Sequence, residues 1–404
     1  MKYEEKKLSE LVDTISDTRK IDKDKVVLVN TSDVLAGEVL NHTYTENCNL
    51  RGQFKKRFKT DDILYSEIRP ANKRFAYIDF DSEDYIASTK LMVLRRKSDK
   101  ITNRYLYYCL INDLFVDRMQ HLAEARSGTF PQITFDVLKG ETIYLPSIVN
   151  QNKITSILDN INNKIRLNNE INNNLFELLK QEFRDKFYNK EEKDSYLIDY
   201  ISETIGGDWG KENPEGNNNT KVYCVRGADI PSMEYGNKGN APIRYILEKN
   251  YKNKKLDPNN IIIEISGGSP TQSTGRTAYI TKNILDMYDS PLLCTNFCRA
   301  IETKSDILAP FVYMNLKLMY EDDIFFNWEN GTTGIKNLAL NDMLSNLEVK
   351  SPDEIQLKDY YLLFNNVMNK ISSNSNENIK LEQLRDTLLP KLMNGEIDLD
   401  NIEI

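Results

Sequence analysis

The sequence predicts an α+β chain in which two similar globular domains are separated by two long helices, and the helices pair as an antiparallel coiled coil with pseudo-twofold symmetry. Three observations lead to this fold class. The second half of the 404 residues repeats the features of the first half in order. Each half begins with short β-like runs. Each half ends in a long stretch with helical apolar spacing.

The internal repeat is visible in several matched segments. DDILYSEIRP resembles NNIIIEISGG, and FAYID around Ala76 resembles TAYIT around Ala278. RSGTFPQITFDVLKGETIYLP ends at Pro146, and ENGTTGIKNLALNDMLSNLEVKSP ends at Pro352, 206 positions later. The spacing between matched segments grows along the chain, as expected when loops lengthen after a duplication.

The segments after Pro146 and Pro352 predict the two long helices. Ser147 and Asp353 are suitable N-cap residues directly after the prolines. Apolar residues then recur at 3.5 to 3.6 residue spacing, and they match between the halves. The residues predicted to pair the helices are Ile154, Leu158, Ile161, Ile165, Asn168, Leu175, Phe364, Val367, Ile371, Asn374, Leu381 and Leu384.

These patterns divide the chain into four predicted parts. The globular domains are 1–146 and 191–351, and the helices occupy 147–190 and 352–404. The first domain contains the β-like runs KVVLVN, DDILYSEI and LMVL, and the second contains KVYCV and NIIIEIS. Each domain also carries a late helical stretch, NRYLYYCLINDLFVDRMQHLAEA in the first and APFVYMNLKLMYEDDIFFN in the second.

The run NNKIRLNNEINNN, from Asn162 to Asn174, lies in the middle of the first predicted helix. Its repeat equivalent, ISSNSNEN, is also polar. We expect Asn168 and Asn374, a matched pair, to meet near the pseudo-twofold axis and to fix the helix register, because a polar residue at a core position specifies alignment. Compositional bias with a frayed or water-filled helix centre is the alternative.

Composition predicts a cytoplasmic protein without a membrane segment. The chain has no stretch of eighteen apolar residues, and its five cysteines include no Cys-x-x-Cys pair. The net charge of −8 argues weakly against nucleic-acid binding. However, RGQFKKRFK, from Arg51 to Lys59, is strongly basic, and a local basic face can bind phosphates.

Catalytic signatures are missing from the sequence. It has two histidines without metal-ligand spacing, no phosphate-binding GxxxxGK(S/T) loop and no GxGxxG. The proline contexts contain neither the Asn/Asp-Pro-Pro-aromatic motif of amino-methyltransferases nor a Pro-Asp…(Asp/Glu)-x-Lys nuclease motif. We therefore expect no catalytic residue, no metal site and no cofactor in this chain. SGGSPTQSTGRT, from Ser266 to Thr277, fits a DNA-contacting loop or a structural loop equally well.

The junction sequence ARSGTFPQITFDVLKGETIYLPSIVNQNKITSILDNINNKIRLNNEINNNLFELLKQEFRDKF resembles the end of a target recognition domain and the following central helix in DNA-specificity (S) subunits of type I restriction-modification systems. NGTTGIKNLALNDMLSNLEVKSP and LEQLRDTLLPKLMNGEI resemble the second junction and distal helix. ISGGSPTQSTGRTAYI with PLLCTNFCRAI resembles a recognition-domain core. The resemblance covers essentially the whole chain.

The resemblance implies a non-catalytic subunit. Two recognition domains would each read half of a bipartite site in double-stranded DNA, and the helices would set the gap. Two methyltransferase (M) subunits carrying S-adenosylmethionine would dock on it, and a translocase-nuclease restriction (R) subunit can join. The alternatives are a fused enzyme, or a scaffold that joins two protein-binding modules and does not bind DNA.

Residues that read bases at groove edges are usually Arg, Lys, Asn, Gln, Ser or Thr. The candidate DNA-binding residues of the first domain are Arg51, Lys55, Lys56, Arg57, Arg69, Lys73 and Arg74. Those of the second domain are Gln272, Ser273, Arg276, Thr332, Thr333 and Lys336.

Overall fold

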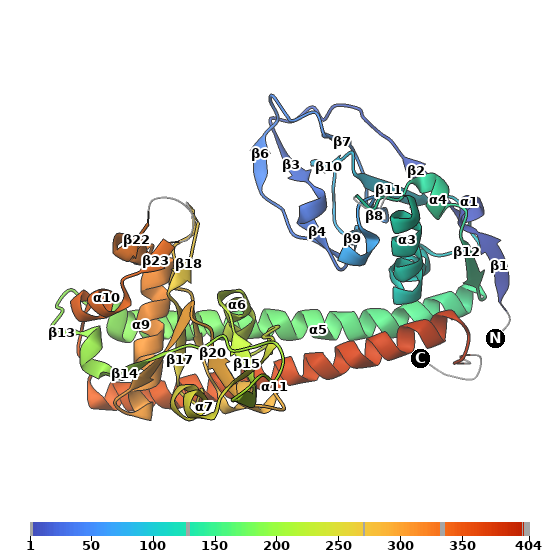
Figure 1. Cartoon of the computed structure of the whole chain (residues 1–404). Helices are drawn as coiled ribbons and strands as arrows, with labels where there is room; N and C mark the ends of the chain where they lie inside the picture. The colour runs from blue at the N-terminus through green and yellow to red at the C-terminus, as the bar shows by residue number, and fades with distance from the viewer. Residues whose placement is uncertain (1–2, 127–129, 270, 332–335, 398, 400–404) are drawn as a thin grey trace. The chain divides into compact units, whose positions relative to one another are not determined.

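A computed structural model describes residues 3–126, 130–269, 271–331, 336–397 and 399. Two compact units are present (Figure 1). The first unit comprises Met1–Asn163 with Leu381–Ile404, and the second comprises Lys164–Lys380. Each unit therefore contains one globular domain and a portion of both long helices. None of the helices within the described residues is long and apolar enough to cross a membrane.

The first unit contains two four-stranded sheets, with strand orders β2-β11-β8-β9 and β6-β3-β10-β7. Its strands are β1 (Glu4–Lys7), β2 (Val12–Ile15), β3 (Lys25–Val29), β4 (Val34–Leu35), β5 (Glu38–Val39), β6 (Tyr44–Glu46), β7 (Phe54–Lys56), β8 (Ile63–Ser66), β9 (Phe75–Tyr77), β10 (Tyr85–Ser88), β11 (Leu91–Arg96) and β12 (Thr142–Leu145). Its short helices are α1 (Leu8–Leu11), α2 (Asn103–Ile111), α3 (Asp113–Arg126) and α4 (Phe135–Leu138). The central strands β8 and β11 begin with fully buried apolar runs, as expected for strands covered on both faces.

The second unit repeats this topology. Its strands are β13 (Ser195–Tyr196), β14 (Ile201–Gly206), β15 (Asn218–Val225), β16 (Ile243–Leu247), β17 (Ile261–Glu264), β18 (Ser266–Gly267), β19 (Thr277–Tyr279), β20 (Leu292–Cys294), β21 (Cys298–Thr303), β22 (Glu329–Asn330), β23 (Lys336–Leu338) and β24 (Glu348–Val349). Its short helices are α6 (Ile230–Glu234), α7 (Glu248–Lys254), α8 (Lys282–Asp286), α9 (Ala309–Glu321) and α10 (Leu340–Asn346).

Matched strands occupy matched places in the two units. The antiparallel order β14-β21-β17-β19 corresponds to β2-β11-β8-β9, and the registers agree, because Ile63 faces Tyr77 as Ile261 faces Tyr279. Each unit also has one parallel pair, β3 with β10 and β15 with β20. The second sheet of the second unit, β16-β15-β20, has no described strand at the place of β7. The strand β7 belongs to the basic run RGQFKKRFK, so the two domains differ at this edge.

The two long helices are α5 (Ile148–Phe183), which is followed by a π-helical turn, and α11 (Glu354–Met393). The predicted N-caps are confirmed. The Ser147 hydroxyl oxygen accepts from the Asn150 N–H at 3.3 Å, and an Asp353 carboxylate oxygen accepts from the Ile355 N–H at 3.0 Å. Prolines two residues before each helix limit extension toward the N-terminus.

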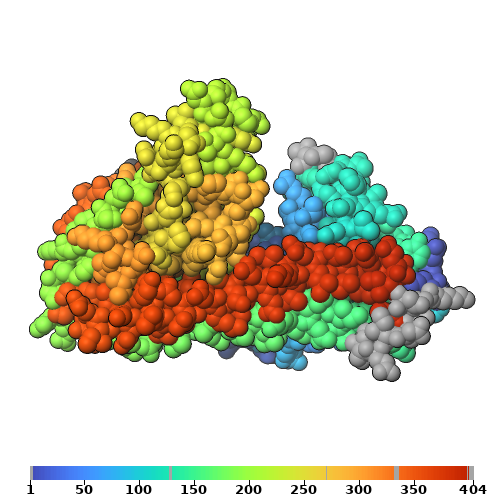
Figure 2. All heavy atoms as spheres, turned by 90° about the horizontal axis from the view of Figure 1, so that it is seen from below, coloured from blue at the N-terminus to red at the C-terminus, as the bar shows by residue number. Residues whose placement is uncertain are grey.

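Within each unit, α5 and α11 lie side by side and share a core with the globular domain (Figures 1 and 2). Phe176 and Phe183 of α5 share the core of the second unit with Tyr360 and Phe364 of α11. The Tyr360 hydroxyl donates to the Leu179 carbonyl at 3.0 Å. Residues with increasing numbers along α5 bond to residues with decreasing numbers along α11: Asn168 to Asn378, Asn172 to Asn374 and Leu179 to Tyr360. The two helices are therefore antiparallel.

The side chains predicted to pair the helices differ in burial. The buried ones are Ile154, Leu158, Ile161, Asn168, Phe364, Val367, Ile371 and Asn374. Ile165, Leu175 and Leu381 are half-buried. Leu384 is 47 % exposed, because the buried face at this end of α11 is formed by Leu389 and Leu392 instead.

Candidate nucleic-acid interface

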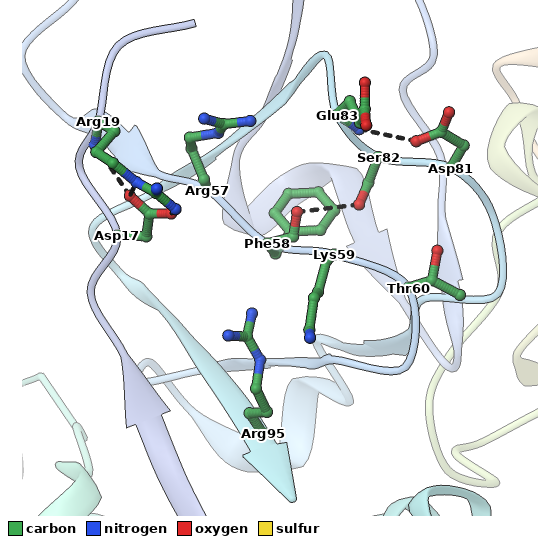
Figure 3. Close-up of a pocket in the computed structure, with 10 residues that line it drawn as sticks. All are labelled: Asp17, Arg19, Arg57, Phe58, Lys59, Thr60, Asp81, Ser82, Glu83 and Arg95. Atoms are coloured by element: carbon green, nitrogen blue, oxygen red, sulfur yellow. Dashed lines mark hydrogen bonds and ion pairs between the residues drawn. The ribbon is translucent and has the colours of Figure 1, made fainter.

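A polar cavity of about 520 Å³ in the first unit follows strand β7 (Figure 3). Its lining residues are Asp17, Arg19, Arg57, Phe58, Lys59, Thr60, Asp81, Ser82, Glu83 and Arg95. The local fold places Arg57 here through its backbone, whose N–H donates to the Asp17 carbonyl at 2.8 Å. Four of the lining residues are cationic, which is a common composition for a phosphate-binding surface.

Two of these cations are held by carboxylates. Arg19 donates to both Asp17 oxygens, at 2.9 and 2.6 Å, and this ion pair holds the pKa of Asp17 well below its usual range. Arg95 makes two bonds of 2.7 Å to Asp62, which is fully buried. The geometry of the Arg95–Asp62 pair is bidentate. The Arg95 side chain is therefore engaged within the fold and is not free to bind a ligand.

Arg57 and Lys59 remain available for an anion. Within the described residues, neither side chain has an ion pair or a hydrogen bond. Arg57 is half-buried and Lys59 is exposed at the cavity. Asp81 and Glu83 also line the cavity, so a bound phosphate would be favoured near the two free cations and disfavoured near the acids.

The other predicted DNA contacts of the first domain fall into two groups. Lys56 is tied to the sheet, because its ammonium donates to the Thr89 and Leu91 carbonyls at 2.9 Å each, and burial lowers its pKa. Lys73 bonds to Asp113 at 2.7 Å. Arg74 also donates to carbonyl oxygens, that of Ser32 at 2.8 Å and that of Val34. Arg51, Lys55 and Arg69 are exposed. Among the described residues, no side-chain partner engages these last three.

The predicted contacts of the second domain are mostly engaged within the fold. Arg276 makes bonds of 2.9 and 2.7 Å to Glu264, which is buried. Lys336 bonds to Glu329 at 2.6 Å, and Ser273 is buried. Gln272 is exposed and donates to the Tyr320 hydroxyl at 3.3 Å. Thr332 and Thr333 lie outside the described residues.

The structure also adds residues that the sequence prediction did not select. Lys59 stands at the end of the basic run RGQFKKRFK, so the charge pattern could have identified it. Arg19 lies in the segment SDTRK and reaches the cavity because the neighbouring Asp17 pairs with Arg57 through the backbone. No signal in a single sequence indicates that pairing.

A buried polar layer occupies the centre of the helix pair in the second unit. It contains Asn168 and Asn172 of α5 with Asn374 and Asn378 of α11, each at most 4 % exposed. Asn168 donates to the Asn378 side-chain oxygen at 2.9 Å, and Asn374 donates to the Asn172 oxygen at 2.8 Å. The predicted Asn168–Asn374 contact is thus replaced by two bonds, each reaching one helical turn away.

The bonds of this layer occur in pairs related by the internal repeat. Asn168 is the repeat equivalent of Asn374, and Asn172 is the equivalent of Asn378, so the two amide bonds are equivalent. A second equivalent pair joins the Asn172 amide to the Ser375 hydroxyl at 3.3 Å and the Asn378 amide to the Asn169 oxygen at 2.8 Å. The local pseudo-twofold axis therefore passes between the four asparagines.

The sequence of this chain is similar to those of known specificity proteins. Residues 1–177 match the family described as type I restriction modification DNA specificity domain. The chain is 26 % identical over 445 residues to the type I restriction enzyme HindI specificity subunit of Haemophilus influenzae, covering 92 % of this chain and 94 % of that protein. It is 24 % identical over 332 residues to the MjaIX specificity subunit of Methanocaldococcus jannaschii, covering 75 % and 71 %.

A solved structure shows the same fold. The type I restriction-modification S subunit from M. genitalium has a TM-score of 0.54 at 15 % identity, covering 97 % of this chain and 96 % of that one. The duplicated domain topology, the two long helices and these relatives lead to one conclusion. Residues 1–177 match the specificity-domain family, and over most of its length the chain is similar to type I restriction-modification specificity subunits.

Proposed function

We propose that this chain is the non-catalytic subunit that reads a bipartite DNA site, with one half-site for each globular domain and the helix pair as the spacer between them. The observation that supports the proposal is that both the globular domains and the long helices are duplicated. Two domains share one sheet order and register, and two helices share a reciprocal polar layer. A duplicated reader suits a site with two separated parts.

The helix lengths suit this role. At 1.5 Å per residue, the 36 residues of α5 and the 40 residues of α11 extend about 54 and about 60 Å. Half-sites on one face of B-DNA are separated by about 34–36 Å per helical turn. Helices of this length therefore match a gap between half-sites of one to two turns.

The proposed phosphate contacts of the first domain are Arg51, Lys55, Arg57, Lys59 and Arg69. These side chains have no hydrogen bond or ion pair within the described part of the chain, whereas the predicted cations of the second domain are paired with acids. Each phosphate contact made by a lysine or arginine releases counterions and makes the affinity fall with salt. We therefore expect the first domain to contribute most of the salt dependence.

The proposed partners are two methyltransferase subunits, which would carry S-adenosylmethionine, and a restriction subunit that joins them. Exposed apolar side chains at repeat-equivalent positions support two equal docking surfaces. Val149 is 65 % and its equivalent Ile355 is 72 % exposed, while Leu178 and its equivalent Leu384 are each 47 % exposed. Each unit thus presents one member of each pair. Val149→Ser and Ile355→Ser should each reduce the bound methyltransferase from two copies toward one.

A methylome experiment tests the proposal in the native cell. Deleting the gene should abolish adenine or cytosine methylation at one bipartite motif, and expressing the chain should restore it. Purified chain alone, incubated with labelled S-adenosylmethionine and DNA, should transfer no methyl group. Methylation of an uninterrupted motif, or transfer by the chain alone, would contradict the proposed role.

A scaffold that does not bind DNA remains the second candidate, favoured by the net charge of −8 and by the paired cations of the second domain. Salt discriminates the two. Binding of the methyltransferase-loaded chain to DNA should weaken steeply between 50 and 200 mM salt if phosphates are contacted. Absence of DNA binding at 50 mM salt, with both methyltransferase copies bound, would favour the scaffold.

A further inference from the structure

The polar layer of the helix pair continues into the second globular domain. The Asn172 amide of α5 donates to the Ser375 hydroxyl of α11 at 3.3 Å, and the Ser375 hydroxyl donates to the Tyr235 carbonyl at 3.0 Å. Tyr235 directly follows α6 in the second domain. Asn374 donates to Asn172 at the other end, so a continuous chain of hydrogen bonds links both helices to the domain.

The Tyr235 segment contacts both helices closely. The Tyr235 ring meets the Phe176 ring of α5 edge-on, with centroids 5.7 Å apart. Gly236 follows in the left-handed region, at φ +73, and a Cβ built there would lie 3.2 Å from the Ile371 Cγ2 and 3.5 Å from the Ser375 hydroxyl oxygen. The absence of a side chain at Gly236 therefore determines how closely this segment approaches α11.

The repeat-equivalent position on α5 lacks the corresponding link. The repeat equivalent of Ser375 is Asn169, which accepts from Asn378 at 2.8 Å. Among the described residues, Asn169 has no hydrogen bond to a globular domain. Among the described residues, the layer is therefore linked to the second domain through Ser375 and not through the equivalent Asn169. Apolar packing is non-directional and tolerates small slides, whereas hydrogen bonds require defined positions.

We propose that Ser375 and Gly236 are positioning residues that fix the second recognition domain at one place along α11, in step with the asparagine layer. Ser375 supplies the directional hydrogen bond to Tyr235, and Gly236 sets the distance between the Tyr235 segment and α11. A shift of the helix register would then move the second domain with it. The consequence for the DNA gap rests on the proposed bipartite function, whereas the position of the domain on the helix does not.

Spin-label distances in the full chain, without DNA, test this positioning. Exposed labels are placed at Lys249→Cys in the second domain and at Asn366→Cys on α11, in a Cys48→Ser background, since the other four cysteines are buried. Gly236→Asn adds a side chain against α11 while asparagine tolerates the left-handed backbone. We expect it to lengthen the mean distance. Ser375→Ala should broaden the distance distribution at an unchanged helix content.

Two matched variants serve as controls. Gly239→Asn places the same side chain at φ +67, where a Cβ would lie 3.2 Å from the Asp229 Cβ of the same domain, so it strains the domain without touching α11. Asn169→Ala removes the repeat-equivalent acceptor. Both should retain the wild-type distance distribution. A wild-type distribution in Gly236→Asn and Ser375→Ala, or equal changes in the controls, would overturn the proposal. Failure of bipartite DNA recognition would leave these distances unaffected.

Discussion

The buried asparagine layer makes a specific prediction about pairwise coupling. Asn168 is bonded to Asn378 at 2.9 Å, and the layer gives no bond between Asn168 and Asn374. Asn168→Leu leaves the buried Asn378 side-chain oxygen without its donor, and Asn378→Leu leaves one N–H of the buried Asn168 amide without its acceptor, and each such loss costs about 1–3 kcal/mol. We therefore expect Asn168→Leu and Asn378→Leu each to lower the free energy of unfolding by about 1–3 kcal/mol.

The double variant should recover much of this loss. With both asparagines replaced, neither the donor nor the acceptor of the Asn168–Asn378 bond is left buried without its partner, and two leucines are buried in their place. The coupling energy of the Asn168–Asn378 cycle should therefore be about 1–3 kcal/mol, within the range measured for directly bonded residues. Replacing all four asparagines should yield a helix pair at least as stable as the wild type, with a less specific register.

Urea unfolding of the full chain measures these differences, with the slope checked for constancy between variants. The Asn168–Asn374 cycle is the matched control, because these residues are repeat equivalents without a direct bond, and its coupling should be smaller. Equal coupling energies in the two cycles, or strictly additive losses for Asn168 and Asn378, would refute the reciprocal arrangement of the layer.

Three further predictions follow from the engaged and the free polar groups. Arg57→Ala with Lys59→Ala should weaken DNA binding and reduce the salt slope by about 2, at 0.9 per phosphate contact; an unchanged slope would exclude them as phosphate contacts. Arg276→Ala should destabilise the chain by about 3 kcal/mol, since it leaves Glu264 buried without its partner, and a thermal scan showing wild-type stability would contradict this. Tyr108→Phe removes a 2.6 Å hydrogen bond to a carboxylate of α5 and should cost about 1.5–3 kcal/mol in urea unfolding. A smaller loss than that of an exposed control tyrosine would speak against that contact.

The long helices were predictable because their signals are local. A proline, an N-cap residue and a sustained apolar period are each recognisable within a short segment of sequence. As these signals predict, α5 begins two residues after Pro146 and α11 begins two residues after Pro352. The internal repeat also predicts two similar globular domains. Residues Ile63 and Ile261, matched in sequence, occupy equivalent places in β8 and β17.

The sequence predicts a contact between Asn168 and Asn374, but each of these residues bonds to a partner one helical turn away, for a geometrical reason. In an antiparallel pair, a residue meets its own repeat equivalent only if it lies on the twofold axis. The axis passes between Asn168 and Asn172, so each bonds the equivalent of the other. The sequence spacing indicated which residues are central but not where between them the axis passes.

The DNA-contact residues were less predictable because pairing within the fold depends on tertiary neighbours. Arg276, which directly precedes β19, faces Glu264 at the end of the neighbouring strand β17, and Lys336 of β23 faces Glu329 of the neighbouring strand β22. A single sequence shows the charges without these partners. Lys59 was missed although it stands in the basic run, since its freedom from an ion pair is visible only in the structure.

The proposed function requires that the two domains read one bipartite site across a fixed gap. Its most direct test is the affinity of the methyltransferase-loaded chain for duplexes that carry both half-sites of the methylated motif, with the gap varied one base pair at a time. We predict tight binding at the native gap and binding no better than that of a single half-site when the gap changes by half a helical turn. Equal affinity for one half-site, for both half-sites and for every gap length would contradict bipartite recognition by this chain.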